Sequence, residues 1–441
     1  MEATPGENSE AVNESAQWLL PERARLLHIG IPKTGTTALQ QAASSRRAQL
    51  LNSNVRYPTR FVNHRDAVSG LMGRRWGWSG LGSSIPPRSA WDALMAEIEA
   101  DTTRRTLISH EFGSEADDET AREFVSELGP STHIVITLRA VGAILPSAWQ
   151  QYIKTGYVGA LDTWLKAVIG DTPKLSVTPS YHRRNDQGGV VKRWVAAAGP
   201  QNVTVVVLDK DRPHLLYDAF EGMLGLPEGM LRDESSSGFR ANRGMSLSES
   251  ELIRNFNVLI KGRRVNWDDY HSLIRLGGAA RLLEKRVPAE GEPPVRLPAW
   301  AAERAIELGK RYAADIEESG VRVIGDLNQL YLPVTPRDED ATDRVADVPV
   351  DIAVQTLGGV FSAATGRGAT FAELVADGGE TSSSARALVR TANMPTSRVS
   401  TADLVRVLGG RIVRKGQDIR RDRQRRKRNT SAGQNIQREA E

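Results

Sequence analysis

The chain has 441 residues, of which 40% are hydrophobic and 25% charged, the balance of an ordinary globular protein rather than a disordered or fibrous one. This length predicts one large domain or two. The chain contains no cysteine, which excludes disulfide scaffolds, cysteine nucleophiles, iron–sulfur clusters and Cys-ligated zinc.

The net charge of +4 is unevenly distributed. Between Arg411 and Arg428 there are ten basic residues and two aspartates, so this segment carries +8 and the remainder sums to −4. The first 17 residues contain four glutamates and no basic residue, which is typical of neither a signal peptide nor a transit peptide. No stretch approaches the ~20 apolar residues that span a bilayer. We therefore expect a cytoplasmic protein with a mildly acidic body.

Short apolar runs rich in β-branched residues alternate with helical patterns along the first half of the chain. The runs show almost no polar alternation, which predicts parallel strands covered on both faces. Strands are expected at residues 25–31, 105–109, 133–138 and 203–208, and helices at residues 36–51, 90–100, 119–128, 143–154 and 188–198. This order predicts a three-layer α/β/α fold around a central, mostly parallel sheet.

From Leu247 to about Tyr331 the pattern is mostly helical, with a last short strand at 321–324, and we interpret this part as the end of the same domain. The acidic segment that begins at Thr335 has no apolar periodicity and marks a boundary. The expected organisation is a disordered N-terminus at 1–22, an α/β domain at 23–334, a weakly helical C-terminal extension at 335–410 and a basic, disordered tail at 411–441.

A glycine-rich segment, His28–Thr37, joins the first expected strand to the first expected helix. Such a turn directs backbone N–H groups and a helix N-terminus to one place, which makes an anion site. Gly30 and Gly35 have the spacing of a Walker A motif, but Thr36 stands where that motif has lysine, and the lysine is Lys33. Lys33 would meet a phosphate group from inside the loop, with no metal required.

The segment from Pro32 to Thr37 resembles the phosphate loop of the sulfotransferases that use 3′-phosphoadenosine 5′-phosphosulfate (PAPS), which has the form P-K-[ST]-G-[ST]-[ST]. The resemblance implies a P-loop-type fold and PAPS as co-substrate. It also implies that the 5′-phosphosulfate is bound by the loop residues Pro32, Lys33, Thr34, Gly35, Thr36 and Thr37.

A second element agrees with this resemblance. The third expected strand ends at Arg139, and Ser147 follows eight residues later on the next helix, so both should lie beside the loop at the carboxyl edge of the sheet. In the resembling family an Arg and a Ser at this spacing bind the 3′-phosphate, and an arginine fork suits a phosphate dianion. A weaker match implies that Arg240 or Arg243 closes over the 3′-phosphate and adenine; a solvated turn is the alternative.

Sulfuryl transfer to an alcohol needs alignment, stabilisation of the leaving phosphate and a base for the acceptor proton. Lys33 and the N–H groups of Gly35–Thr37 can stabilise the charge. His110 and Glu111 follow the second expected strand and are the candidate bases. Histidine has an ordinary pKa near the working pH, whereas glutamate followed by an aromatic residue resembles the saccharide-modifying and bacterial members. We favour Glu111 and keep His110 open, the alternative being a pair that only caps the next helix.

Tryptophan and arginine lie between the loop and the candidate bases, at residues 74–78 and at Trp91. Aromatic faces and arginine forks suit sugars or anionic substrates. These residues favour contact with a sugar or anionic acceptor, with packing as the alternative. Together with the resemblance, they imply a hydroxyl-bearing acceptor, a saccharide or glycolipid.

Two other functions stay open. A P-loop phosphotransferase would need a Walker lysine and a magnesium-binding carboxylate. A non-catalytic protein would act through the basic tail, which lacks interleaved aromatic residues and predicts at most weak contact with anionic surfaces and no specific nucleic acid.

Overall fold

The computed structural model describes residues 17–79, 81–174, 176–232, 243–338, 345 and 347–365. Within these residues the strands form one six-stranded sheet with the order β2-β3-β1-β4-β5-β6, and each neighbouring pair is parallel. The strands are β1 (Arg25–His28), β2 (Val55–Arg56), β3 (Arg105–Ser109), β4 (Thr132–Leu138), β5 (Val203–Val207) and β6 (Arg322–Ile324). The predicted α/β fold with a parallel sheet is confirmed.

Helices connect the strands and continue after them. They are α2 (Thr36–Ser45), α3 (Arg47–Asn52), α4 (Arg65–Leu71), α5 (Ser89–Glu99), α6 (Asp118–Leu128), α7 (Val141–Ile153), α8 (Leu161–Ile169), α9 (Pro179–Asn185), α10 (Gln187–Ala198), α11 (Leu215–Leu224), α12 (Leu247–Ile260), α13 (Trp267–Tyr270), α14 (Ala280–Lys285), α15 (Ala299–Glu318) and α16 (Val350–Thr365). A π-helix, η4 (His271–Ala279), joins α13 to α14, and 3-10 turns lie at η1 (Glu111–Glu115), η2 (Pro200–Asn202) and η5 (Leu327–Tyr331).

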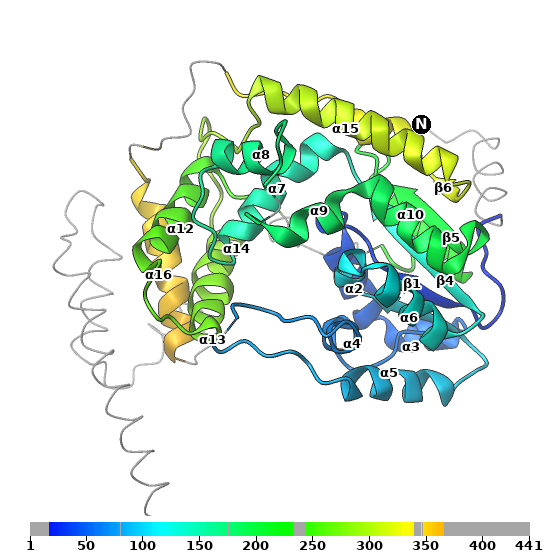
Figure 1. The fold of residues 1–441 in the computed structure, drawn as a ribbon. Helices are drawn as coiled ribbons and strands as arrows, with labels where there is room; N and C mark the ends of the chain where they lie inside the picture. The colour runs from blue at the N-terminus through cyan, green and yellow to red at the C-terminus, as the bar shows by residue number, and fades with distance from the viewer. Residues whose placement is uncertain are drawn as a thin grey trace, which may run out of the picture.

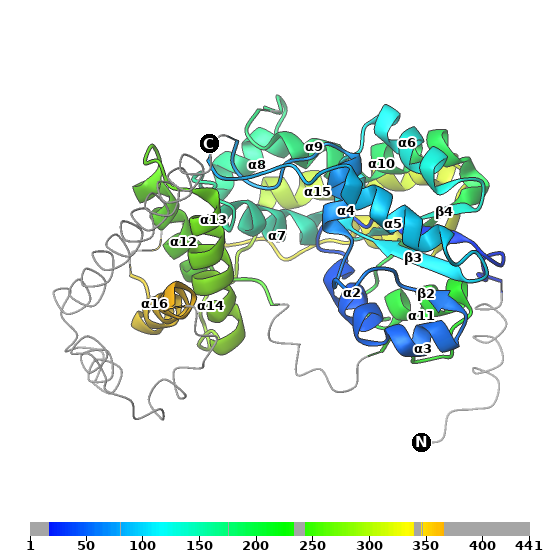
Figure 2. The same ribbon diagram turned by 90° about the horizontal axis from the view of Figure 1, so that it is seen from below.

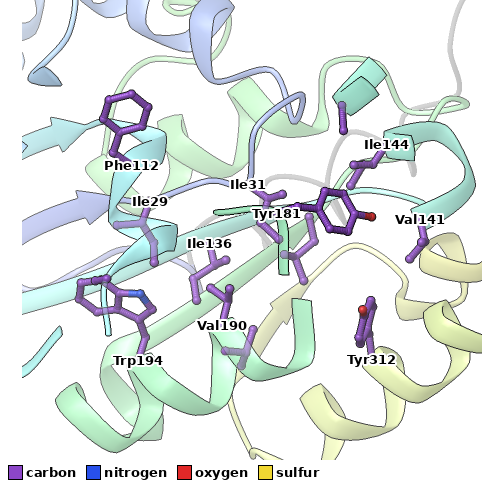
Figure 3. Close-up of a cluster of buried hydrophobic side chains, with 14 of the residues drawn as sticks. Ile29, Ile31, Phe112, Ile136, Val141, Ile144, Tyr181, Val190, Trp194 and Tyr312 are labelled. Carbon is purple, nitrogen blue, oxygen red and sulfur yellow. The ribbon is translucent and has the colours of Figure 1, made fainter. Parts of the chain in front are cut away.

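The four central strands, β3, β1, β4 and β5, are buried on both faces, which explains their apolar runs. Successive strand residues point to opposite faces, so Leu26 and Val135 enter one core with α2 and α11, whereas Leu27 and Ile136 enter the other with α6, α10 and α15. Figure 2 shows α2, α3 and α11 on one side of the sheet and α5, α6, α10 and α15 on the other. Part of the larger core is drawn in Figure 3, where Ile136 of the sheet lies among side chains of α10.

Polar side chains mark where several helices begin. Asp117, Asp186 and Ser246 each accept a hydrogen bond from a backbone N–H in the first turn of α6, α10 and α12, respectively. These N–H groups have no acceptor inside the helix, so a capping side chain stabilises the start.

Two boundaries differ from expectation. The helix expected at 36–51 is two helices, because the backbone at Arg46 leaves helical geometry, with φ −112° and ψ 22°. Leu20 is buried, and its N–H donates to the Met223 carbonyl at 2.9 Å, so the α/β body includes residues before 23.

After the sheet, α12, α13, α14 and α16 gather at one end of the molecule (Figure 1). Helix α16 lies within the extension expected at 335–410 and packs on η4 so closely that a Cβ at Gly277 would lie 2.8 Å from the Gly359 carbonyl oxygen. The Arg286 guanidinium also pairs with Asp351 at 2.6 Å. The structure therefore joins the start of the expected extension to the body.

The expectations for residues 1–16 and for the basic tail at 411–441 lie outside the described residues, as does the part of the extension after 365. Among the helices that are described, none is both long and apolar enough to cross a membrane.

Candidate functional site

The phosphate loop, residues 29–37, joins the end of β1 to the first turn of α2. Gly35 caps α2 with φ +79°, a conformation that favours glycine, and Lys33 also has a positive φ of 76°, which is rare for a residue with a side chain. The Thr34 hydroxyl donates to the Ile31 carbonyl at 2.6 Å and closes the turn. The first N–H groups of α2 are consequently left for an anion.

A buried hydrogen-bond network lies beneath the loop. His28 Nδ1 is 2.9 Å from Ser109 Oγ and His28 Nε2 is 3.1 Å from Thr137 Oγ1, which is in turn 2.6 Å from Thr34 Oγ1. All four side chains are buried, and burial lowers the pKa of His28 to about 3, so the neutral ring offers one donor and one acceptor. The network fastens the loop to the carboxyl ends of β3, β1 and β4.

The loop fits a phosphate-sized anion. Thr36 Oγ1 is buried and has no hydrogen-bond partner within the described structure, so an anion oxygen could accept the hydrogen bond that this hydroxyl has available. Glycine is needed at residue 30, because a Cβ there would collide with Thr137 Oγ1. The Lys33 side chain is exposed, yet dehydration and then the nearby cations Arg275 and Arg139 lower its pKa. Added negative charge would relieve that repulsion.

Arg139 follows β4 and lies beside the loop, where the topology predicts it. Its Nη1 donates to the Lys33 carbonyl at 3.4 Å, and Gln187 Nε2 donates to the Arg139 carbonyl at 2.8 Å. Ser147 lies on α7, where its hydroxyl donates to the Ile144 carbonyl of its own helix at 2.9 Å. The arrangement brings Arg139 to the loop; binding of a 3′-phosphate by this pair stays a prediction.

His110 and Glu111 lie at the carboxyl end of β3, next to the loop. His110 is buried and its Nδ1 accepts the Phe112 N–H at 3.1 Å, so the neutral ring carries its proton on Nε2. Burial lowers the pKa of His110. His110 Nε2 lies 3.8 Å from the half-buried Glu111 carboxylate.

These contacts distinguish the two candidate bases. Burial raises the pKa of Glu111, but the charge that His110 carries when protonated, a backbone N–H and the Arg184 guanidinium outweigh it and lower the pKa overall. Glu111 is therefore ionised at neutral pH and can accept a proton. His110 caps η1, and its Nε2 already carries a proton, so its position favours orienting Glu111.

Two cations that the sequence analysis missed complete the site. Lys154 follows the last residue of α7, and dehydration and the charges of Lys33 and Arg275 lower its pKa well below the ordinary value. Arg275 lies on η4, and its pKa falls to about 10, first because of burial. Lys154 could have been found, because it lies seven residues after Ser147 and thus on the same helix face.

An aromatic wall, in which Trp267 and Tyr270 are buried, adjoins the site through Trp76. Trp76 lies 5.5 Å from the Phe112 ring and 5.7 Å from the Trp267 ring, measured between centroids, and the Arg275 guanidinium stands 5.0 Å from the Trp76 ring. The members of the wall are Trp76, Trp78, Trp267, Tyr270 and His271.

Two other residues of the expected acceptor region, Trp91 and Arg74, are engaged in packing and ion pairing within the protein. Trp91 is fully buried against Phe124, so for this residue the packing alternative is correct and the acceptor interpretation is wrong. The Arg74 guanidinium forms a bidentate pair with Glu115 at 2.7 and 2.9 Å. Arg74 therefore supports the wall rather than offering a free fork.

Arg243 does not reach the site in this conformation. Its guanidinium forms a bidentate pair with the buried Glu249 at 2.6 and 2.8 Å and also donates to the Leu282 and Arg286 carbonyls. Closure of Arg243 over a cofactor would break these bonds, so its expected role stays untested. Arg240 lies outside the described residues.

No cluster of three or more His, Cys, Asp or Glu side chains that could hold a metal occurs among the described residues. No protein-family profile matches the chain, and no curated protein matches it in sequence. A structural comparison matches the crystal structure of a sulfotransferase from Alicyclobacillus acidocaldarius at 16% identity, covering 57% of this chain and 100% of that one, with a TM-score of 0.35. Similarity at that level identifies neither function nor substrate, so the functional conclusion rests on the residues of the site.

Proposed function

We propose that this chain is a sulfotransferase that moves the sulfuryl group of PAPS to a hydroxyl of an acceptor, a saccharide or glycolipid. The observation that carries the proposal is the loop before α2, where the Lys33 ammonium forms no ion pair among the described residues, Arg139 donates to the Lys33 carbonyl, and the charge of Glu111 acts on Lys33. The resemblance of Pro32–Thr37 to the PAPS loop supplies the identity of the anion.

Each residue then has a chemical task. The N–H groups of Gly35–Thr37, the Thr36 hydroxyl and Lys33 bind the 5′-phosphosulfate and stabilise the charge that remains on the phosphate as the S–O bond breaks. Arg139, with Ser147, binds the 3′-phosphate. The acceptor oxygen forms the new S–O bond, and its proton passes to the Glu111 carboxylate.

The network beneath the loop supports this assignment. Thr34 is bonded to Thr137, and Thr137 to His28, so the loop is held by buried groups that do not contact solvent. A loop that is rigid before the ligand arrives stabilises transition-state charge without reorganising.

Calorimetric titration with 3′-phosphoadenosine 5′-phosphate (PAP), in parallel with ATP plus Mg²⁺, tests the proposal. We expect PAP to bind without metal, and Lys33→Ala to weaken binding at least about tenfold, the loss of one charge-assisted contact. Lys166→Ala, a change at an exposed lysine of α8, is the matched control. If the protein binds ATP with Mg²⁺ but not PAP, the phosphotransferase is favoured. If it binds neither PAP nor ATP, both enzyme hypotheses are contradicted.

A further inference from the structure

On the basis of the proposed function, we propose that the acceptor is a hydroxylated ring compound that carries a carboxylate, with the carboxylate bound between Arg275 and Lys154 and the ring lying along Trp76. The site would then contain a separate subsite that binds the carboxylate of the acceptor.

The first support is the excess of unpaired positive charge. Within the described residues neither Lys154 nor Arg275 forms an ion pair, whereas the half-buried Arg74 pairs with Glu115 and the buried Arg286 with Glu249 and Glu292. Glu111 is the carboxylate whose charge acts on both Lys33 and Arg275. Because Lys33 is assigned to the donor, two basic groups, Arg275 and Lys154, remain beside the single Glu111 carboxylate. A further anion that keeps Lys154 protonated would balance their charge.

The second support is a pair of unsatisfied donors. Arg275 Nη1 and Trp76 Nε1 are both buried and have no acceptor within the described structure, and the guanidinium carbon of Arg275 lies 5.0 Å from the Trp76 ring. Both groups can only donate, so an acceptor oxygen is needed to satisfy them. A carboxylate presents two oxygens and suits an arginine fork.

The third support is the position of the wall relative to Glu111. Phe112, the next residue in the chain, lies 5.5 Å from Trp76 with the two rings tilted by 38°. The charge of Glu111 also acts on Arg275, whose guanidinium lies 5.0 Å from the Trp76 ring, so a ring bound along Trp76 would lie on the Glu111 side of the site. A compound held at its carboxylate by Arg275 would then direct a hydroxyl toward the base. Charge recognition and proton removal are thus performed by neighbouring parts of one surface.

The test uses full-length protein saturated with PAP and two matched probes, 4-nitrophenyl β-D-glucuronide and 4-nitrophenyl β-D-glucoside, which differ by a carboxylate in place of a hydroxymethyl group. We expect the glucuronide to bind about tenfold more tightly, as one charge-assisted contact allows. Arg275→Gln should reduce the preference to less than about twofold, and Arg275→Lys, which keeps the charge but not the fork, should retain part of it. Arg281→Gln, a change at an arginine of α14, is the matched control and should keep the full preference.

Equal affinity for the two glycosides, no binding of either at millimolar concentration, or an Arg275→Gln variant that keeps the preference would overturn the assignment. PAP binding is measured first and serves as the folding check for each variant. Failure of the wild-type protein to bind PAP overturns the proposed function and this inference together, whereas intact PAP binding without a glucuronide preference overturns only the inference.

Discussion

The Thr34 hydroxyl lies 2.6 Å from the Thr137 hydroxyl, so the phosphate loop is bonded directly to the carboxyl end of β4. Thr137 also meets His28 at 3.1 Å. The position of Lys33, one residue before Thr34, therefore depends on the buried hydroxyl of Thr137.

Replacing that hydroxyl by a methyl group, Thr137→Val, should loosen the loop. The buried His28 and Thr34 lose a partner, which costs about 1–3 kcal/mol in the free energy of unfolding, and PAP affinity should fall about tenfold. Urea unfolding and calorimetry measure the two effects. Thr204→Val is the control, because Thr204 is bonded to the buried His133 at 2.8 Å on β5, away from the loop. The Thr204→Val variant should lose stability and keep its PAP affinity. If Thr137→Val and Thr204→Val bind PAP equally well, the role of Thr137 is contradicted.

Glu111→Gln separates the two candidate bases. It removes the proton acceptor and keeps the shape, so kcat should fall at least about 100-fold, in the range of general-base catalysis, with PAP affinity retained. His110→Asn keeps an acceptor for the Phe112 N–H and should lower kcat less than about tenfold. The measurement is the turnover of labelled sulfate with an acceptor found by screening. A larger loss in His110→Asn than in Glu111→Gln would reverse the assignment.

Binding of an anion should take up protons. The pKa of Lys154 is lowered well below its ordinary value because the ammonium is dehydrated and faces Lys33 and Arg275. A bound anion favours the charged form and raises this pKa, so protons are bound at any pH between the free and bound values. Calorimetry in buffers of different ionisation enthalpy measures the uptake. Uptake should shrink in Lys154→Met, and an unchanged value would exclude Lys154 as its source.

Acid should destabilise the fold through buried histidines. Burial lowers the pKa of His28 to about 3, and mainly burial lowers those of His64 and His133 to about 4. Their unfolded pKa is about 6.5, so the unfolded chain binds more protons below that value and stability falls as the pH drops from 6.5 toward 4. Each histidine should cost about 2 kcal/mol by pH 5. Urea unfolding between pH 7 and pH 5 measures the loss, and a flat profile would contradict the neutral buried rings.

The ion pair of Arg243 distinguishes a structural from a ligand-binding role. Arg243→Gln leaves the buried Glu249 with one arginine instead of two, since Arg286 also binds it at 2.9 Å. If the role is structural, the melting temperature falls and PAP affinity stays within about twofold, as for a residue distant from the ligand. A fall in PAP affinity with normal stability would support closure over the nucleotide.

The sequence predicts those structural features that are determined by residues close together in the chain. The strand around Ile134–Ile136 is buried on both faces and therefore apolar throughout, so it is visible as a run of β-branched residues. The loop around Lys33 is equally local. Arg139 was predicted because the carboxyl ends of parallel strands share one edge of the sheet.

Long-range packing accounts for what the sequence did not predict. Arg275 lies 242 positions after Lys33, on a π-helix in close contact with α16. No residue spacing in the sequence indicates that the two cations lie near each other. The sequence cannot distinguish Trp91 as a core residue from Trp91 as an acceptor contact, because tryptophan occurs both in cores and at ligand surfaces; the structure places it in the core. Arg243 precedes α12 and Glu249 lies in its first turn, so the hydrophobic periodicity of the helix does not predict that the two form an ion pair.

The close contact between α16 and η4 has a consequence for synthesis on the ribosome. Lys33 leaves the ribosome early, but the π-helix that carries Arg275 gains its covering glycine contact only once residue 359 has emerged. At about 5–20 residues per second this interval lasts on the order of tens of seconds. A nascent chain shorter than 359 residues lacks the glycine contact that covers the helix of Arg275, so this helix gains its packing partner late in synthesis.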